Sequence, residues 1–197
     1  MTQLTGTKKM ILDIAENLFL EGGYGSFSYK HISCALGIKN AAVHYHYPTK
    51  PDLGTAIVVR ARRRFERWRE NIDKRGLDPS TKLDEFFNLF RYFLDAGKIC
   101  YGGALGINFT ALPEKMQEEA HGMGSDFLNW LENLLSIGRQ EGVFAFPGDP
   151  QDQAIVILSS LQGVLQMARN YGPSCFDIAK SQIIRSMRVS GVLNSHQ

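Results

Sequence analysis

A short stretch of the sequence, residues 39–50, is rich in side chains that can donate hydrogen bonds. It reads KNAAVHYHYPTK. Lysine and asparagine can donate to the edges of bases, and small alanines let a backbone approach those bases closely. Tyrosine, histidine and lysine can also bind phosphates, which position a protein on DNA without reading its sequence. We therefore expect base contacts from Lys39, Asn40, Ala41 and His44, and phosphate contacts from Tyr45, His46 and Lys50.

The two histidines in this stretch also raise the alternative of a metal site. His44 and His46 are two residues apart, so on a helix their side chains point about 200° apart. Metal ligands must converge on one point, and this spacing therefore argues against a shared ion. We predict no metal and no cofactor. For His31, which lies in the preceding helix, we expect an exposed or packed side chain rather than a functional one.

Two short helices with a tight turn between them would position these side chains. Ser28 can cap a helix that runs to Leu36, with Ile32, Ala35 and Leu36 turned inward. Gly37 supplies the backbone freedom that a tight turn needs, and Asn40 can cap the next helix, which ends before Pro48. This is the spacing of a helix-turn-helix, whose second helix enters the major groove of DNA.

The segment FSYKHISCALGIKNAAVHYHYPTKPDLG resembles the DNA-binding signature of the TetR family of regulators. The resemblance covers roughly residues 8–55, including the preceding amphipathic helix and the GGYGSFS link. It implies the division of base and phosphate contacts given above, with Ser28 added to the DNA-binding residues. The sequence departs from the family's pattern at His44, where an aromatic residue is common, and at Asn40, where Lys or Arg is frequent. These departures concern the operator sequence rather than the mode of binding.

Charge is distributed unevenly along the 197 residues, whose net charge is +2. Residues 1–75 hold 13 Lys and Arg against 7 Asp and Glu, whereas residues 76–197 hold 9 against 13. A basic first third favours contact between that part and a polyanion. The alternative is that the arginines of residues 60–69 only solvate an exposed helix.

Helical periodicity dominates the rest of the chain and predicts an all-α fold of about nine helices. The N-terminal one carries Ile11, Ile14, Ala15, Leu18 and Phe19, and a long fourth helix should run from Pro51 to about Arg75. Further helices are expected over 83–94, 104–112, 113–142, 154–171 and 174–189, with Gly122 and Gly124 bending or interrupting the seventh. We place a three-helix DNA-binding domain at residues 1–52 and a larger ligand-binding and dimerisation domain at residues 53–197.

An excess of large aromatic side chains marks the middle of the second domain. Such a stripe is usually core packing, but the resemblance places the glycine-rich link around Cys100 beside an inducer pocket, which would be largely apolar. The candidate pocket residues are Phe65, Trp68, Phe86, Phe90, Cys100, Leu105, Phe109, Phe127 and Trp130. Cys100 could be a plain buried thiol or a sensor of oxidants or electrophiles, whereas Cys34 is expected in the core.

The last two helices are apolar over more than one face, which indicates burial or pairing. The resemblance implies that they pair with the same helices of a second chain, so that two recognition helices reach successive major grooves of a near-palindromic operator. Three cysteines with no close pairing favour a reducing cytoplasm, and we expect no signal peptide and no membrane span.

The prediction is therefore a repressor that leaves double-stranded DNA when a small molecule binds or modifies it. An enzyme is disfavoured because the sequence lacks the nucleophile-elbow, phosphate-loop, HExxH and EF-hand patterns. A helix-turn-helix adaptor that binds a protein instead of a metabolite stays open.

Overall fold

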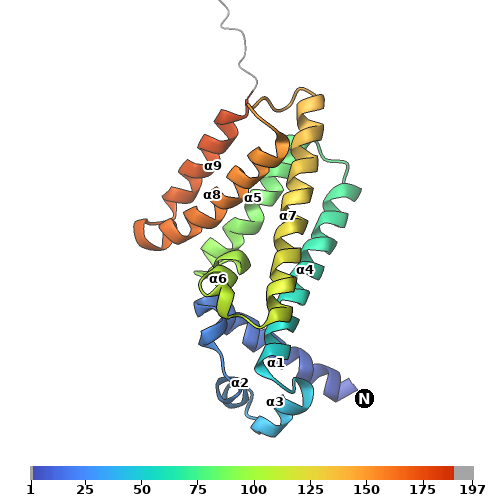
Figure 1. The fold of residues 1–197 in the computed structure, drawn as a ribbon, viewed down its shortest axis with the longest axis vertical. Coiled ribbons are helices and arrows are strands. Elements are labelled where there is room, and N and C mark those ends of the chain that lie inside the picture. Colours follow the sequence, from blue (N-terminus) through green and yellow to red (C-terminus); the bar gives the residue numbers. More distant parts are fainter. Residues whose placement is uncertain (1, 189–197) are drawn as a thin grey trace, which may run out of the picture. The chain divides into compact units, whose positions relative to one another are not determined.

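The computed structural model describes residues 2–188, and in that range it contains helices and no strands (Figure 1). This confirms the all-α prediction. The α-helices are α1 (Thr2–Gly22), α2 (Tyr29–Leu36), α3 (Asn40–His46), α4 (Lys50–Lys74), α5 (Pro79–Asp95), α6 (Tyr101–Gly106), α7 (Glu114–Gln140), α8 (Pro150–Tyr171) and α9 (Ser174–Ser186). Two short 3-10 helices, η1 (Tyr24–Ser26) and η2 (Phe109–Ala111), lie between them.

By packing, the chain forms two compact units. The first comprises Met1–Asn71 and Asp95–Ser125, and the second comprises Ile72–Leu94 and Asp126–Gln197. The segment around α6 thus packs with the N-terminal helices, although the sequence analysis assigned it to the ligand-binding domain. Packing units and functional domains are different divisions, and the predicted domain boundary after residue 52 stays a prediction.

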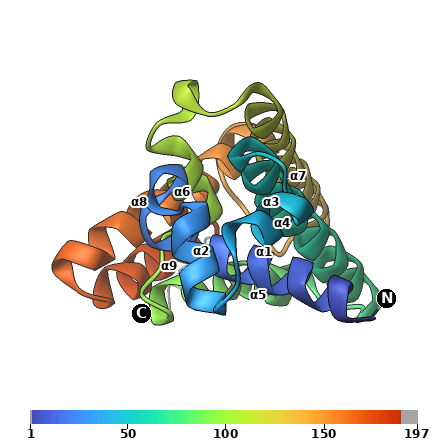
Figure 2. The ribbon, with the colours of Figure 1, turned by 90° about the horizontal axis from the view of Figure 1, so that it is seen from below.

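The first unit is built on α1, α2 and α3, which lie against one another (Figure 2). Ile11, Ala15 and Phe19 recur at helical spacing and are fully buried, so they form the inner face of α1. Phe27 and Ile32 in the following segment are also buried, and α2 packs against α1. A shared apolar core therefore fixes the two short helices that carry the candidate interface.

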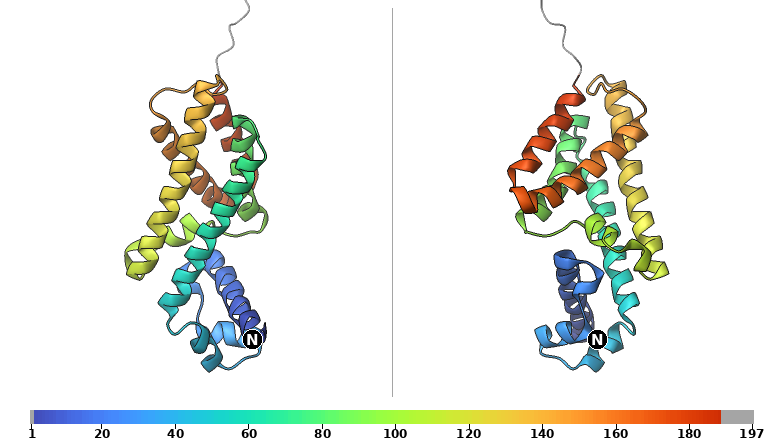
Figure 3. Two further views of the ribbon diagram at one scale, coloured as in Figure 1. Left: turned by 90° about the vertical axis from the view of Figure 1, so that its right-hand side faces the viewer. Right: turned by 60° about the vertical axis from the view of Figure 1, so that its left-hand side comes forward.

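The second unit packs the aromatic face of α5 against the later part of α7. Phe86 is fully buried, and its ring stacks on Trp130 with the ring centroids 5.3 Å apart. Phe87, Leu131 and Leu135 are buried in the same unit. Figure 3 shows α8 and α9 side by side. The turn between them begins at Gly172, which adopts a positive φ of 95° that favours glycine.

Several sequence predictions about the individual helices were wrong. The structure shows α7 unbroken through Gly122 and Gly124, and α6 begins before the predicted Ala104 because Cys100 Sγ accepts a hydrogen bond from the Gly103 amide. The α8 helix starts at Pro150, whose fixed φ suits a first turn. The predicted end of the last helix at Val189 lies outside the described residues.

Two positions predicted to face the core are exposed. Ala35 and Cys34 both lie on the solvent side of α2, because the buried face of this short helix consists of Tyr29, Ile32 and Ser33. No described helix is long and apolar enough to cross a membrane.

Candidate nucleic-acid interface

The turn between α2 and α3 has the geometry that the sequence predicts. Ser28 adopts an extended conformation, and its hydroxyl accepts a hydrogen bond from the His31 amide at 3.2 Å, which caps α2. Gly37 closes the helix in the left-handed region, with φ 64° and ψ 30°, and its amide donates to the Cys34 carbonyl. The chain then turns directly into α3.

The cap of α3 differs from the prediction by one residue. Lys39 is the N-cap, and Asn40 is the first residue of the helix. The Asn40 side chain is bonded instead to α2, where its Oδ1 accepts a hydrogen bond from Ser33 Oγ at 2.5 Å. Asn40 therefore joins the two helices, and its amide nitrogen is the part of the side chain left for a base edge.

The exposed face of α3 carries the predicted base-contacting residues. Four of its residues are exposed, and they form two pairs that are each one helical turn apart: Asn40 with His44, and Ala41 with Tyr45. Val43, which lies between them in sequence, is fully buried. Tyr45 has 72% of its surface exposed. Lys39 at the start of the helix is exposed too, whereas His46 is half-buried with its ring edge-on to Tyr45. One side of α3 thus offers hydrogen-bonding groups to a partner.

Tyr29 anchors the far end of α3 to α2. Its hydroxyl donates to the Tyr47 carbonyl at 2.6 Å, and the His44 ring lies edge-on to its ring at 4.4 Å. Burial, with a smaller contribution from the negative charge of Asp52, raises the pKa of Tyr29 to about 12. The phenol therefore keeps its proton and its hydrogen bond at neutral pH. Tyr29 was not among the residues predicted from the sequence to be functional.

The start of α4 is fixed by a capping box that the sequence analysis also missed. The Thr49 hydroxyl accepts from the Asp52 amide at 3.2 Å, and Asp52 Oδ2 accepts from the Thr49 amide at 3.0 Å. The signal was present as a threonine followed three residues later by an acid. Because Thr49 precedes Lys50, this box also sets where Lys50 emerges.

Lys50 lies on an aromatic surface. Its ammonium group is 4.6 Å from the centre of the Tyr24 ring and 4.7 Å from that of Phe27. Partial burial lowers the pKa of this amine, while attraction to the ring faces favours its charged form. The two rings thus fix the position of the Lys50 ammonium group at the edge of the candidate interface.

Many of the arginines in the basic first third are engaged in ion pairs within the first unit. Arg60 pairs with Asp13 and Glu16, Arg64 pairs with Glu16, and Arg62 pairs with Glu119 at 2.7 Å. These three arginines hold helices together, so this part of the α4 run is not simply a solvated face. The exposed Lys39 and Tyr45 of the α3 segment are better placed to meet a polyanion.

Comparison with known proteins shows that the same segment matches a protein family. The family described as bacterial regulatory proteins, tetR family, matches residues 11–57, which include α2 and α3. A TetR-family transcriptional regulator from Agrobacterium tumefaciens superposes with a TM-score of 0.89 at 26% identity, over 94% of this chain and 100% of that one. Residues 11–57 therefore match the DNA-binding segment of the TetR family, and the fold as a whole is similar to that of a TetR-family regulator.

Two further proteins are similar to this chain. A TetR transcriptional regulator from Legionella pneumophila superposes with a TM-score of 0.83 at 28% identity, over 92% of this chain and 97% of that one. The HTH-type transcriptional repressor BepR of Brucella suis biovar 1 (strain 1330) is 36% identical over 56 residues, 28% of this chain. The chain spans about a quarter, 27%, of the length of this curated relative.

The predicted pocket residues fall into two groups. Phe65, Trp68, Cys100, Leu105 and Phe109 belong to the first unit, where the Phe65 and Trp68 rings stack at 5.5 Å. Phe86, Phe90, Phe127 and Trp130 belong to the second unit, where Phe86 contacts the other three rings. The four rings of the second unit form one packed cluster. The part of either group in a ligand site stays a prediction.

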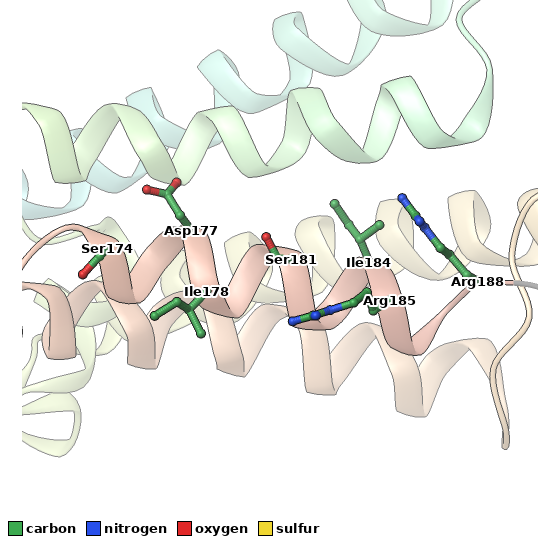
Figure 4. Close-up of a pocket in the computed structure, with 7 residues that line it drawn as sticks. All are labelled: Ser174, Asp177, Ile178, Ser181, Ile184, Arg185 and Arg188. Carbon is green, nitrogen blue, oxygen red and sulfur yellow. The ribbon is translucent and has the colours of Figure 1, made fainter.

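Two hollows in the second unit are lined by other residues. One, of about 620 Å³, runs along α9, and Figure 4 shows the seven residues that line it. The other, of about 410 Å³, lies among α5, Phe144 and the end of α9. Both are lined in part by Ile184 and Arg188.

Cys100 is only 3% exposed, and burial raises the pKa of its thiol. Because the thiolate is the form that attacks electrophiles, these surroundings favour a packed thiol over a reactive sensor.

Proposed function

We propose that this chain is a one-component transcriptional repressor that binds double-stranded DNA through α3. The observation that carries the proposal is the exposed face of α3, which presents Lys39, Ala41 and Tyr45 after the tight turn at Gly37. Base edges in the major groove offer acceptors to such donors, and phosphates accept from the residues at the rim. A DNA-binding regulator acts on the chromosome, which agrees with the cytoplasmic location expected from the cysteines.

Selection from a pool of random double-stranded DNA tests this directly. The wild-type chain should enrich one sequence class, and that class should be near-palindromic if two recognition helices bind together. Lys39→Ala should enrich a different or broader class, because it removes a donor to a base edge. Failure of the wild-type chain to enrich any sequence would contradict the proposal.

We propose further that the helices beyond the DNA-binding segment bind a small-molecule effector and a second copy of the chain. The aromatic clusters around Phe65 and Phe86 supply the apolar surface that such an effector needs. Exposed apolar side chains on α8 and α9 support the pairing of these helices with a second copy, and they are Ile155, Val156, Met167, Tyr171 and Ile178.

An adaptor that binds a protein instead of a metabolite is the second candidate. Thermal unfolding in the presence of a metabolite panel separates the two, because a ligand that binds the folded chain raises its unfolding temperature. The effector found must also weaken DNA binding, and DNA must weaken effector binding by the same factor. Equal effector affinity with and without DNA would contradict the repressor scheme.

Cys100→Ser tests the alternative that chemical modification is the signal. The burial of this thiol predicts that the variant responds to inducing compounds like the wild-type chain. Loss of the response to an oxidant or electrophile, with responses to other compounds retained, would restore Cys100 as a sensor.

A further inference from the structure

A buried carboxylate lies at the meeting point of α1, α4 and α6 in the first unit. Glu16 is 7% exposed and accepts hydrogen bonds from three side chains. Arg60 donates through Nη2 at 2.5 Å and Nε at 3.3 Å, Arg64 donates through Nη1 at 2.8 Å, and the Tyr101 hydroxyl donates at 2.7 Å. A buried charge needs such partners, because its desolvation is otherwise costly.

The charges at this meeting point balance. Arg60 also donates to Asp13 at 2.5 Å and to the Leu12 carbonyl at 2.8 Å. Two guanidinium groups thus face two carboxylates, and Tyr101 is the neutral partner. Burial, and next the negative charge of Glu16, raise the pKa of Tyr101, so its hydroxyl stays protonated and continues to donate.

The segment that carries Tyr101 is attached to α1 at several further points. The Ile99 amide donates to the Leu20 carbonyl at 2.9 Å, and the Lys98 ammonium donates to Asn17 Oδ1. A Cβ added to Gly23 would lie 3.1 Å from the Ala104 carbonyl oxygen, so the end of α1 and α6 approach closely. Any displacement of α6 must therefore break contacts with the helix that supports α2 and α3.

We propose that Tyr101 is a positioning residue for DNA binding, holding α1 and α4 through Glu16 in the arrangement that presents α3. The inference rests on the proposed function and adds its regulation. When α6 moves, Tyr101 leaves Glu16, the carboxylate keeps only its arginines, and the support beneath α2 and α3 changes. The network is a chain of direct contacts from α6 to the DNA-binding helices, which is the kind of path that can carry coupling.

Tyr101→Phe is the test, because it removes the hydroxyl and keeps the ring that packs. Its matched control is Tyr92→Phe, an exposed tyrosine on α5 in the second unit. Affinity is measured by fluorescence anisotropy on a duplex recovered by selection with the wild-type chain. We expect Tyr101→Phe to bind about tenfold more weakly, within the range of typical coupling between sites, and Tyr92→Phe to bind like the wild-type chain.

Hydrogen exchange gives a second readout that a merely structural role would not move. In the wild-type chain, adding the duplex should slow amide exchange over residues 98–106, because coupling is reciprocal. In Tyr101→Phe this protection should be lost or reduced.

The outcomes are distinct. This inference alone would be contradicted if Tyr101→Phe bound DNA with wild-type affinity. It would also be contradicted if DNA did not change the rate of amide exchange over residues 98–106 in the wild-type chain. A lowered unfolding temperature with unchanged affinity would likewise make Tyr101 a structural residue and overturn it. Failure of the wild-type chain to bind any duplex would contradict the proposed function and this inference with it.

Discussion

Lys39 and Lys50 stand at opposite ends of the recognition segment in different surroundings. Lys39 is exposed at the N-cap of α3, whereas Lys50 is half-buried over the rings of Tyr24 and Phe27. An exposed lysine at the start of a helix can reach into a groove, whereas a lysine whose position is fixed by packing can bind one particular phosphate. Replacing each of the two residues should therefore change DNA binding in a different way.

Lys50→Ala should weaken binding to all DNA sequences by a similar factor and lower the salt slope of binding by about one, because one phosphate contact is lost. Lys39→Ala should weaken binding and also change which sequence is preferred. Anisotropy on selected and unrelated duplexes at several salt concentrations measures both effects. Intact affinity in Lys50→Ala would remove the phosphate assignment.

Tyr29 predicts how stability depends on pH. Its pKa is raised to about 12, whereas tyrosine in an unfolded chain ionises near 10. Between about pH 10 and 12 the unfolded chain therefore loses a proton that the folded chain keeps, and the free energy of unfolding falls as pH rises. Denaturant unfolding should show a shallower fall for Tyr29→Phe than for the wild-type chain.

At pH 7 the same variant should lose about 1 kcal/mol, because the hydrogen bond to the Tyr47 carbonyl is absent. The exposed Tyr92 supplies the control, and Tyr92→Phe should change neither quantity. An identical pH profile in Tyr29→Phe and the wild-type chain would show that Tyr29 does not carry this dependence.

The helices of the DNA-binding segment were predictable from sequence because their signals are local. Ser28, Gly37 and the residue before Pro48 each act within a few positions, and the structure places the helix ends at or next to them. The long helix α7 was predicted less well, since Gly122 and Gly124 weaken a helix only modestly and packing overrides that preference.

Two glycines test this distinction between local and packing effects. Gly37→Ala should destabilise the chain by about 1 kcal/mol or more, because its φ of 64° is unfavourable for alanine. Gly124→Ala should stabilise it by about 0.5–1 kcal/mol, because the position is helical and nothing lies within 4 Å of an added Cβ. Denaturant unfolding measures both changes, and equal effects of the same sign would contradict this account.

At the scale of the whole chain, the sequence could not predict which distant segments pack together. Tyr101 and Glu16 are 85 positions apart, and no periodicity connects them. The assignment of residues 95–125 to the first packing unit therefore became visible only in the structure. Nor could the sequence divide the aromatic excess between the two packing units.

Pairing of two chains makes a further prediction at this scale. Val156 is 52% exposed on α8, and Val156→Glu should place a charge in the proposed interface between two copies. Sedimentation should show a dimer for the wild-type chain and mainly a monomer for this variant. Met10→Glu, at an exposed apolar residue of α1, should remain dimeric.

A dimeric Val156→Glu protein would contradict the assignment of this face. A monomeric wild-type chain at micromolar concentration would contradict pairing through α8 and α9 altogether.

The central claim is that this chain reads a DNA sequence. The most direct test compares the affinity of the wild-type chain for a selected duplex with its affinity for a scrambled duplex of the same composition, across a series of salt concentrations. We predict that the selected duplex binds at least about 10³-fold more tightly. The logarithm of its affinity should fall steeply and linearly with the logarithm of the salt concentration. Equal affinity for the two duplexes, or affinity that does not depend on salt, would contradict it.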